Sequence, residues 1–557
     1  MHFCLHSNLY KIRKIKYLPG VCLFAIVLIF PSLLFSQDTL NWRMTRKANF
    51  ILLDIPVSLE KEVKSHVSKK AKEFYEKGIE QCGDKEYSRA ESSITDAIAA
   101  DINFAEAYNL RGYVYLMTGE HEKALHDLLI AIETDSDYTY SYHNLGLAYT
   151  CLGNYNKALE AFTKYLSKTD GDLYVYNNRG IVNYNLKKST PALADFSAAV
   201  KSGNSTNCIP LINRGILYYS MEDFSSSLDD LTKAIAINPG YLPAYVYRGN
   251  VYCFQQQFEY AKYDFESALK IDSLSVPAIY SKAFMYYVLG ENDKAITYVS
   301  KAIKIDYNDS QSFLLRAYIN IKLKNLQGVI YNLTRAAELN PTEGFILFSR
   351  GNCYLQTGYF NDAIRDYTDA MKLNPNNCNY YYLRGLAYAG KENIDSAQTD
   401  IAHSLELNNK YIPAYLIQAY FYRALDDSAK AFADYKAAIK VDSACIQIYI
   451  ARSEYYNILE DYESSIQDLN KALSINPKLA KTEMDLGYAY MYNKQYDKSD
   501  ESFSKAVALD STLAEAYYKR AFVRILLGKK TEACLDFEEA MKLNYYEAKS
   551  AYEEHCK

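Results

Sequence analysis

Glycine, proline and excess basic charge are all scarce in this sequence. Its 557 residues include only 22 glycines and 12 prolines, which leaves little room for long disordered tracts. Lysine and arginine total 62 against 67 acidic residues, so the formal net charge is -5. Because phosphate binding needs clustered lysine and arginine, this balance argues against a nucleic-acid partner. We therefore expect an ordered protein whose ligand is not a polyanion.

Signatures of metal and cofactor sites are also missing from the sequence. No histidines or cysteines have the spacing of metal ligands. No glycine-rich loop ending in Lys-Ser or Lys-Thr is present to hold a phosphate group. We therefore expect no metal, no cofactor and no catalytic residues.

The N-terminus has the charge and hydropathy pattern of an export segment. Basic residues between Lys11 and Lys16 precede an apolar run from Leu18 to Phe35. This order predicts a signal over residues 1–36, which is either cleaved after Ser36 or kept as a signal anchor. Positive charge on the N-terminal side favours export of the remainder in both cases. The protein is expected in the periplasm or another extracytoplasmic compartment, with membrane contact only if the segment is kept.

A repeat of 34 residues fills most of the chain. Counted from Ala71, fourteen units reach Glu547 with one extra residue, Asn207. Position 8 of the unit is never larger than serine, whereas positions 4 and 11 are often tyrosine. Apolar residues spaced by three and four predict two amphipathic helices per unit. Each unit is therefore expected to be a helical hairpin that buries its apolar face by stacking on its neighbours.

The repeat resembles a known family. The pattern Tyr-x-x-x-Gly-x-x-Tyr, followed by Ala, an aromatic residue and Ala at positions 20, 24 and 27 and by Pro at position 32, is similar to the tetratricopeptide repeat (TPR). The resemblance covers residues 71–547. It implies an all-α fold, a right-handed α-solenoid superhelix of about fourteen hairpins with a C-terminal capping helix at 548–557. Residues 37–70 are interpreted as a linker and an N-terminal helical extension.

Arginine at position 7 of a unit tends to occur with aspartate sixteen residues later. Eight units have both residues, and among the five units that lack arginine only the one with Gln418 and Asp434 keeps the aspartate. This correlation predicts a partly buried, charge-assisted hydrogen bond between the two helices of a hairpin. A contact repeated eight times indicates a structural role. The pairs are Arg111 with Asp127, Arg179 with Asp195, Arg214 with Asp230, Arg248 with Asp264, Arg350 with Asp366, Arg384 with Asp400, Arg452 with Asp468, and Arg520 with Asp536.

The resemblance also implies a binding groove. In the TPR family, positions 5, 9, 12 and 13 of the first helix usually face a concave groove, and here almost none of these positions is charged. We expect a nearly uncharged groove with aromatic residues in its later part, suited to apolar side chains or sugar rings. The alternative is that these residues pack between neighbouring units. The candidates are Tyr280, Phe284, Tyr287, Tyr318, Phe348, Tyr382, Tyr420, Tyr488, Tyr492 and Tyr518.

Only one pair of cysteines suggests a disulfide. Cys534 lies near the start of the last second helix and Cys556 near the end of the closing helix, so antiparallel packing would bring them to similar height. An oxidising compartment would then allow the bond. The other cysteines are interpreted as small apolar residues packed between helices.

These patterns favour one function over another. They favour an exported, non-catalytic scaffold or adaptor that binds protein segments through the groove. The alternative is a glycan-binding protein of envelope polysaccharide assembly or handling, because tyrosine rings also stack on sugars.

Overall fold

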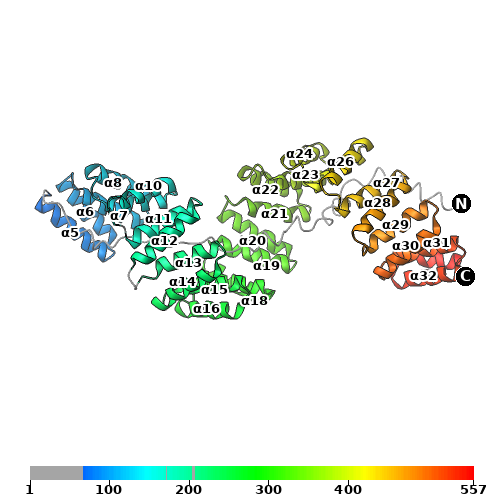
Figure 1. The fold of residues 1–557 in the computed structure, drawn as a ribbon, viewed down its shortest axis with the longest axis horizontal. Helices are drawn as coiled ribbons and strands as arrows, with labels where there is room; N and C mark the ends of the chain where they lie inside the picture. Colours follow the sequence, from blue (N-terminus) through cyan, green and yellow to red (C-terminus); the bar gives the residue numbers. More distant parts are fainter. Residues whose placement is uncertain (1–66, 171, 204–206) are drawn as a thin grey trace. The chain divides into compact units, whose positions relative to one another are not determined.

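The computed structural model describes residues 67–170, 172–203 and 207–557, which form 29 α-helices and no strand (Figure 1). The all-α fold is therefore confirmed. No helix in these ranges is long and apolar enough to span a membrane. The predicted export segment, its cleavage site at Ser36 and the linker up to residue 66 lie outside the described residues.

The described helices fall into two compact units, one within residues 42–323 and one within 324–557. Inside these units, thirteen consecutive helix pairs pack as antiparallel hairpins, as the 34-residue period predicts. The eighth repeat contributes its first helix to one unit and its second helix to the other. The first unit contains α5 (Lys69–Gly83), α6 (Tyr87–Ala100), α7 (Ala105–Thr118), α8 (His121–Thr134), α9 (Tyr140–Cys151), α10 (Tyr155–Leu166), α11 (Leu173–Asn185), α12 (Ser189–Ser202), α13 (Ile209–Ser220), α14 (Phe224–Ile237), α15 (Leu242–Phe254), α16 (Phe258–Ile271), α17 (Val276–Val288), α18 (Asn292–Ile305) and α19 (Ser310–Lys322).

The second unit continues the same alternation of first and second helices and ends with the closing helix α33, which packs on α32. It contains α20 (Leu326–Leu339), α21 (Gly344–Gln356), α22 (Phe360–Leu373), α23 (Cys378–Gly390), α24 (Ile394–Leu407), α25 (Ile412–Ala424), α26 (Ser428–Val441), α27 (Ile446–Ile458), α28 (Tyr462–Ile475), α29 (Ala480–Tyr492), α30 (Tyr496–Leu509), α31 (Ala514–Leu526), α32 (Lys530–Lys542) and α33 (Tyr546–His555).

The small residue at position 8 is explained by what lies opposite it in the hairpin. A Cβ atom on Gly146 would lie 2.5 Å from Cε1 of Phe162, and one on Gly249 would lie 2.5 Å from Cε1 of Phe265. Both phenylalanines are completely buried. Because packed interiors tolerate such overlap poorly, the first helix needs a small residue where the second helix places its large one. This close approach sets the core of each repeat.

The turn inside each hairpin contains one residue in the left-handed region of backbone conformation. Glycine occupies this place in five turns, among them Gly119 and Gly153. Nine other turns use a residue with a side chain, such as Asp426, Glu460 or Lys494. Left-handed backbone is unfavourable for residues with a Cβ atom, so these nine turns are stable only because the hairpin packing holds them.

The two ends of the array differ slightly from the prediction. Helix α5 begins at Lys69 because Ser68 caps it, with the Ala71 amide donating to the Ser68 hydroxyl at 3.2 Å. The helical extension expected before residue 70 is therefore absent at residues 67 and 68, and its remainder lies outside the described residues. At the other end, the closing helix α33 begins at Tyr546, two residues before the predicted start at residue 548.

Candidate binding surface on the first helices

All eight predicted Arg–Asp pairs are in contact in the structure. Each arginine donates through Nε and Nη2 to the two carboxylate oxygens; for Arg350 and Asp366 both distances are 2.7 Å. The eight aspartate side chains are at most 7% exposed and the arginines 11% to 22%. Two-pronged bonds of this kind are geometrically specific and expensive to break from one side. The pairs therefore fasten the two helices of a hairpin and engage both oxygens of each of these eight carboxylates.

Six of these arginines also join neighbouring repeats, which the sequence analysis did not foresee. The remaining nitrogen, Nη1, donates to a serine or threonine hydroxyl at position 25 of the preceding repeat. Lys282 makes an equivalent bond from position 7, donating to Glu266 Oε1 at 3.1 Å. The serine or threonine that recurs at position 25 was the sequence signal that could have predicted these bonds. The bonds are Arg111 to Thr95, Arg214 to Ser197, Arg248 to Thr232, Arg350 to Thr334, Arg384 to Thr368 and Arg520 to Ser504, at 3.0 to 3.3 Å.

In the first unit, positions 5 and 6 of the first helices carry a buried chain of amides, which we call the amide ladder. Asn213 donates to Asn177 at 2.7 Å, Asn177 donates to Asn178 at 3.1 Å, and Asn144 donates to Asn109 at 3.0 Å. All its members are at most 3% exposed. The ladder consists of Asn109 on α7, His143 and Asn144 on α9, Asn177 and Asn178 on α11, and Asn213 on α13.

His143 connects the two parts of the amide ladder. Its Nε2 lies 3.2 Å from Asn178 Nδ2, and its Nδ1 lies 3.4 Å from Asn144 Oδ1. The first contact needs an accepting ring nitrogen and the second a donating one, so the neutral imidazole fits both. Complete burial lowers the pKa of His143 to about 4, which keeps the ring uncharged at neutral pH. The ladder is therefore neutral throughout.

Three aromatic residues that were expected to line the groove are buried. Tyr280 is 3% exposed, and Tyr318 and Tyr382 are 2% exposed. Successive first helices contact one another directly, and Tyr382 packs edge-on against Tyr411 with ring centroids 5.3 Å apart. The prediction of a groove surface is therefore wrong for these three residues, which contribute to packing between repeats.

The other seven aromatic candidates keep some contact with solvent. Tyr492 is 54% exposed, although its ring stacks on Tyr462 with centroids 5.4 Å apart. Phe348 packs on Tyr380 at 5.1 Å. The remaining half-buried members are Phe284, Tyr287, Tyr420, Tyr488 and Tyr518.

Ionisable and aromatic residues meet on the first helices α25, α27, α29 and α31. Tyr488 donates from its hydroxyl to Glu515 Oε1 at 2.5 Å. The Lys519 Nζ lies 5.5 Å from the ring centroid of Tyr488, and the Arg423 guanidinium lies 5.0 Å from that of Tyr420. We call this surface the C-terminal face. Its members are Tyr420, Arg423, Glu454, Asp485, Tyr488, Glu515, Tyr518 and Lys519.

Several ionisable groups of the C-terminal face have shifted pKa values. Burial raises the pKa of Asp485 to about 7, and the negative charges of Glu454 and Glu515 raise it further than Lys481 lowers it. Burial also raises the pKa of Glu454, and it lowers the pKa of Lys519. The expectation of a nearly uncharged groove is therefore wrong here. It omitted positions 2 and 6 of the first helix, where Glu515, Asp485 and Lys519 lie.

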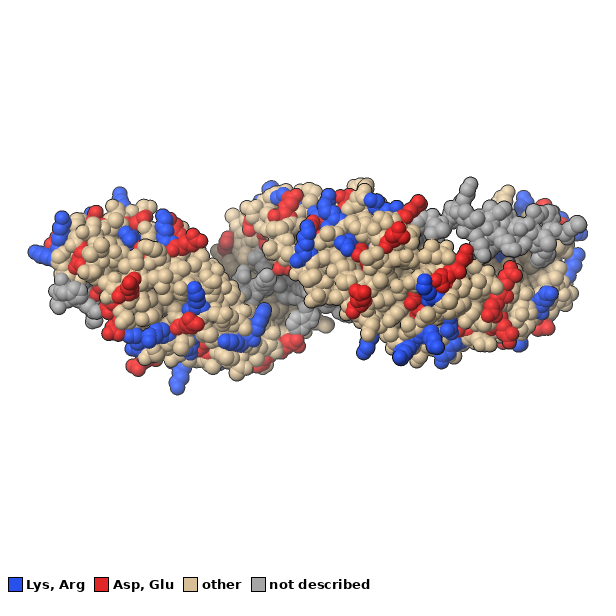
Figure 2. Space-filling model, turned by 90° about the horizontal axis from the view of Figure 1, so that it is seen from above, with Lys and Arg blue, Asp and Glu red and all other residues tan. Residues whose placement is uncertain are grey.

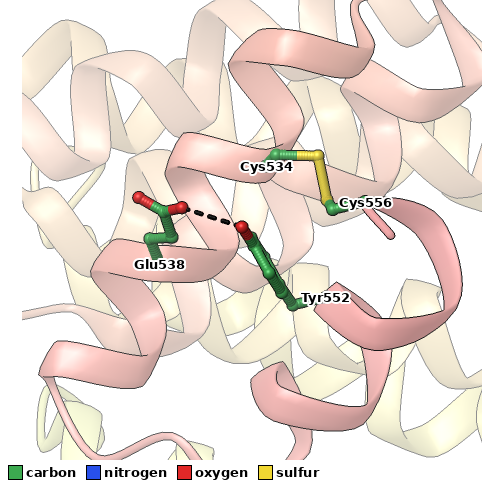
Figure 3. Close-up of a disulfide and its surroundings, with 4 residues drawn as sticks. All are labelled: Cys534, Glu538, Tyr552 and Cys556. Carbon is green, nitrogen blue, oxygen red and sulfur yellow. Dashed lines mark hydrogen bonds between the residues drawn. A yellow bond between two sulfur atoms is a disulfide. The ribbon is translucent and has the colours of Figure 1, made fainter.

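The closing helix is joined covalently to the last repeat in the structure. Cys534 and Cys556 form a disulfide with Cα atoms 5.7 Å apart (Figure 3). Beside it, the Tyr552 hydroxyl donates to Glu538 Oε1 at 3.0 Å, also between α33 and α32. The two links fasten α33 to the second helix of the last repeat.

Family models decide the assignment of the repeats. Models described as TPR repeat or tetratricopeptide repeat match residues 75–138, 141–174, 276–309, 351–391, 379–411, 412–445, 446–479, 484–513 and 514–547. Together the matches span more than half of the chain. The chain belongs to the tetratricopeptide repeat family. The described part of this TPR protein shows basic and acidic side chains interspersed on the face in Figure 2.

The solved structures that resemble this chain have low TM-scores. The APC/C hetero-tetramer Cut9–Hcn1 shares 14% identity over 81% of this chain and 96% of that one, with a TM-score of 0.38. Yeast Tom70 shares 18% over 81% and 95%, with a TM-score of 0.36. YrrB, described as a TPR protein with an unusual peptide-binding site, shares 24% over 33% and 95%, with a TM-score of 0.30. No curated protein matches the sequence. The assignment to the TPR family rests on the repeat models.

Proposed function

We propose that this TPR protein is a non-catalytic scaffold that holds a segment of a partner protein on the C-terminal face. TPR proteins typically serve as protein-binding scaffolds and are generally non-catalytic. The observation that supports this surface is its combination of half-buried tyrosine rings with carboxylates whose charge is poorly compensated. Asp485 is the main example, since burial, and to a smaller extent the negative charges of Glu454 and Glu515, raise its pKa to about 7.

The same charges indicate which kind of segment fits. Glu454, Asp485 and Glu515 lie on three successive first helices, and the negative charges of Glu454 and Glu515 raise the pKa of Asp485. A lysine or arginine side chain of the partner would relieve this repulsion, and its stem would pack on Tyr488 or Tyr518. Binding would then favour the ionised form of Asp485. We therefore expect affinity for basic segments to rise with pH through about 7.

A displayed library of random peptides tests the proposal. The chain from residue 37 onward is used as bait, beside a variant carrying Asp485→Asn and Glu515→Gln. A control variant carries Asp497→Asn and Glu501→Gln, which make the same charge change at exposed sites on the second helix α30. We expect the parent and the control to enrich peptides with lysine or arginine next to apolar residues. The face variant should lose this enrichment.

Two results would contradict the proposal. One is that all three baits enrich the same peptides, which would place binding elsewhere on the molecule. The other is that the parent enriches no class of peptide, while far-UV circular dichroism shows it folded. If the parent instead enriched acidic peptides and the face variant did not, the C-terminal face would remain the binding surface, but the partner segment would be acidic rather than basic.

The glycan-binding alternative has less support from the structure. It needs exposed ring faces on which a sugar can stack. Tyr492 is the most exposed candidate, but its ring already stacks on Tyr462 at 5.4 Å with an interplanar angle of 17°. A screen against immobilised oligosaccharides would revive this alternative if binding were lost in Tyr492→Ala.

We also propose that the scaffold is exported. The support is the order of residues 11–38, in which basic residues are followed by an apolar run and then by polar residues. Cell fractionation with intact-mass analysis tests it. A periplasmic chain beginning at Gln37 would indicate a cleaved signal, and an extracytoplasmic full-length chain in the membrane fraction an anchor. A full-length chain in the cytosol would contradict export.

A further inference from the structure

One repeat keeps the aspartate of the Arg–Asp pair without its arginine. In the repeat formed by α25 and α26, position 7 is Gln418 and position 23 is Asp434. The Asp434 Oδ2 atom is buried, and no hydrogen-bond partner reaches it within the described part of the chain. In the eight paired repeats, the arginine bonds both oxygens of the equivalent carboxylate. Asp434 thus occupies a site built for an ion pair but carries only one of the two charges.

Nearby charged groups do not compensate Asp434. On α25, Arg423 lies over the rings of Tyr420 and Tyr455. On α27, Arg452 is bonded to Asp468, and on α26 itself Lys430 pairs with Asp427 at 2.9 Å.

The other ionisable groups of these elements are Tyr415 and Tyr422 on α25, Lys436, Lys440 and Tyr435 on α26, and Tyr449, Glu454, Tyr455 and Tyr456 on α27. None of them contributes to the shift of Asp434. Burial alone raises its pKa, to about 7.

The junction that follows the hairpin α25–α26 is also the least extensively packed of its kind in its unit. Helix α26 packs less extensively on α27 than any other second helix packs on the next first helix within residues 324–557. The bond from position 7 to the preceding repeat is missing, because position 25 is Lys436 and Arg452 bonds only to Asp468. Aromatic and polar contacts join α26 and α27. Phe432 stacks on Tyr455 and Tyr456 with centroids 5.2 Å and 4.9 Å apart. The Tyr435 hydroxyl donates to the Ala451 carbonyl at 3.2 Å, and the hydroxyls of Ser428 and Tyr455 lie 2.6 Å apart.

We propose that the hairpin α25–α26 is a pH-sensitive joint of the array, whose two helices loosen from each other when Asp434 loses its proton. This proposal is independent of the ligand of the C-terminal face. The missing arginine, the unpartnered oxygen and the reduced packing all occur in the same repeat. Its consequence is that the repeats on the two sides of the joint move more freely above neutral pH than below it.

The direction of the pH effect follows from proton linkage. The folded state holds the Asp434 proton more tightly than the unfolded state, where an aspartate has a pKa of about 3.9. Stability is therefore greatest at low pH and falls as the pH rises toward the folded-state value of about 7. Above that value the loss is complete and the pH dependence levels off. The equilibrium constant for opening α26 should increase by about tenfold per pH unit within this window.

Hydrogen exchange measured by mass spectrometry tests the joint in the full chain. Exchange in α26 is divided by exchange in α28, whose Asp468 is paired with Arg452, so that the intrinsic pH dependence of exchange cancels. In the parent we expect this ratio to rise by about tenfold or more between about pH 5.5 and about pH 8. In Asp434→Asn and in Gln418→Arg, which remove or pair the charge, the ratio should stay flat.

A reciprocal variant guards against a folding artefact. Arg384→Gln recreates the same mismatch one repeat earlier, opposite Asp400, and should give α24 the slope that α26 has in the parent. The proposal is overturned if the parent ratio is flat, or if Asp434→Asn keeps the slope. A folded Arg384→Gln protein without a slope in α24 would also overturn it, because the missing arginine would then not be the cause.

Discussion

The amide ladder of α7 to α13 and the C-terminal face of α25 to α31 both lie on first helices of the repeats but differ in chemistry. The ladder is neutral, hydrogen-bonded along its length and at most 3% exposed. The C-terminal face is ionisable and only partly buried, and the pKa of Asp485 is shifted to about 7. A neutral amide can be buried at little cost once its donors and acceptors are paired, whereas a charge cannot. The comparison teaches that the ladder is a packing surface, whereas the C-terminal face keeps ionisable groups that the proposed recognition would use.

Breaking the ladder should have the largest effect. Asn177→Leu leaves the donor of Asn213 and the acceptor of Asn178 without their partner in the ladder. Each lost partner costs about 1–3 kcal/mol, so local stability should fall by about 4 kcal/mol. Urea-dependent hydrogen exchange in α11 measures this loss. Asn154→Leu, at an exposed cap without a side-chain hydrogen bond, is the control and should change stability by less than about 0.5 kcal/mol.

The pH dependence of the ladder should come next in size. The pKa of His143 is lowered to about 4, so the folded state binds a proton less readily than the unfolded state does. Stability from this group is complete above about pH 6.5 and is lost as the pH falls through about 4, at a total cost of about 3 kcal/mol. Exchange in α9 should show this loss in the parent and not in His143→Asn. An equal acid loss in both proteins would refute the neutral, buried ring. His126→Asn, at a side chain 75% exposed, is the matched control.

The stability of the C-terminal face should depend on pH with the opposite sign and by a smaller amount. Because the pKa of Asp485 is raised, its folded form loses stability as the pH rises toward about 7. Partial solvent exposure reduces the effect, so Asp485→Asn should stabilise α29 by roughly 1 kcal/mol at about pH 8 and weaken binding of basic peptides. Exchange in α29 and peptide titrations measure the two effects. A variant that is less stable and binds as well as the parent would contradict the role given to Asp485.

The turns provide the smallest contrast between the two regions. The turn between α9 and α10 has Gly153 in the left-handed conformation, whereas the turn between α29 and α30 has Lys494. Lys494→Gly should stabilise its hairpin by roughly 0.5 kcal/mol, and Gly153→Lys should destabilise its own by a similar amount. Thermal unfolding of the two variants checks both signs. If neither midpoint moves, the turns contribute nothing to the difference between the regions.

The sequence revealed those features that recur at a fixed position. The small residue at position 8 and the Arg–Asp pair recur in register, so comparing the repeats was sufficient to place Gly249 beside the second helix and Arg350 beside Asp366. The amide ladder was missed because its bonds join position 5 of one repeat to position 6 of another, with histidine once in place of asparagine. The sequence left open whether Tyr280 lines a groove or packs between repeats, and the charge around Asp485 was missed. Both depend on how closely successive first helices approach, and no residue type at one position specifies that distance.

Hydrogen exchange of the whole chain with and without a basic peptide enriched by the parent bait tests the central contrast most directly. The account predicts that the peptide slows exchange in α27, α29 and α31 and leaves α7, α9, α11 and α13 unchanged. Protection confined to α7 through α13 would contradict it, because the surface assigned to packing would then be the one that recognises the ligand.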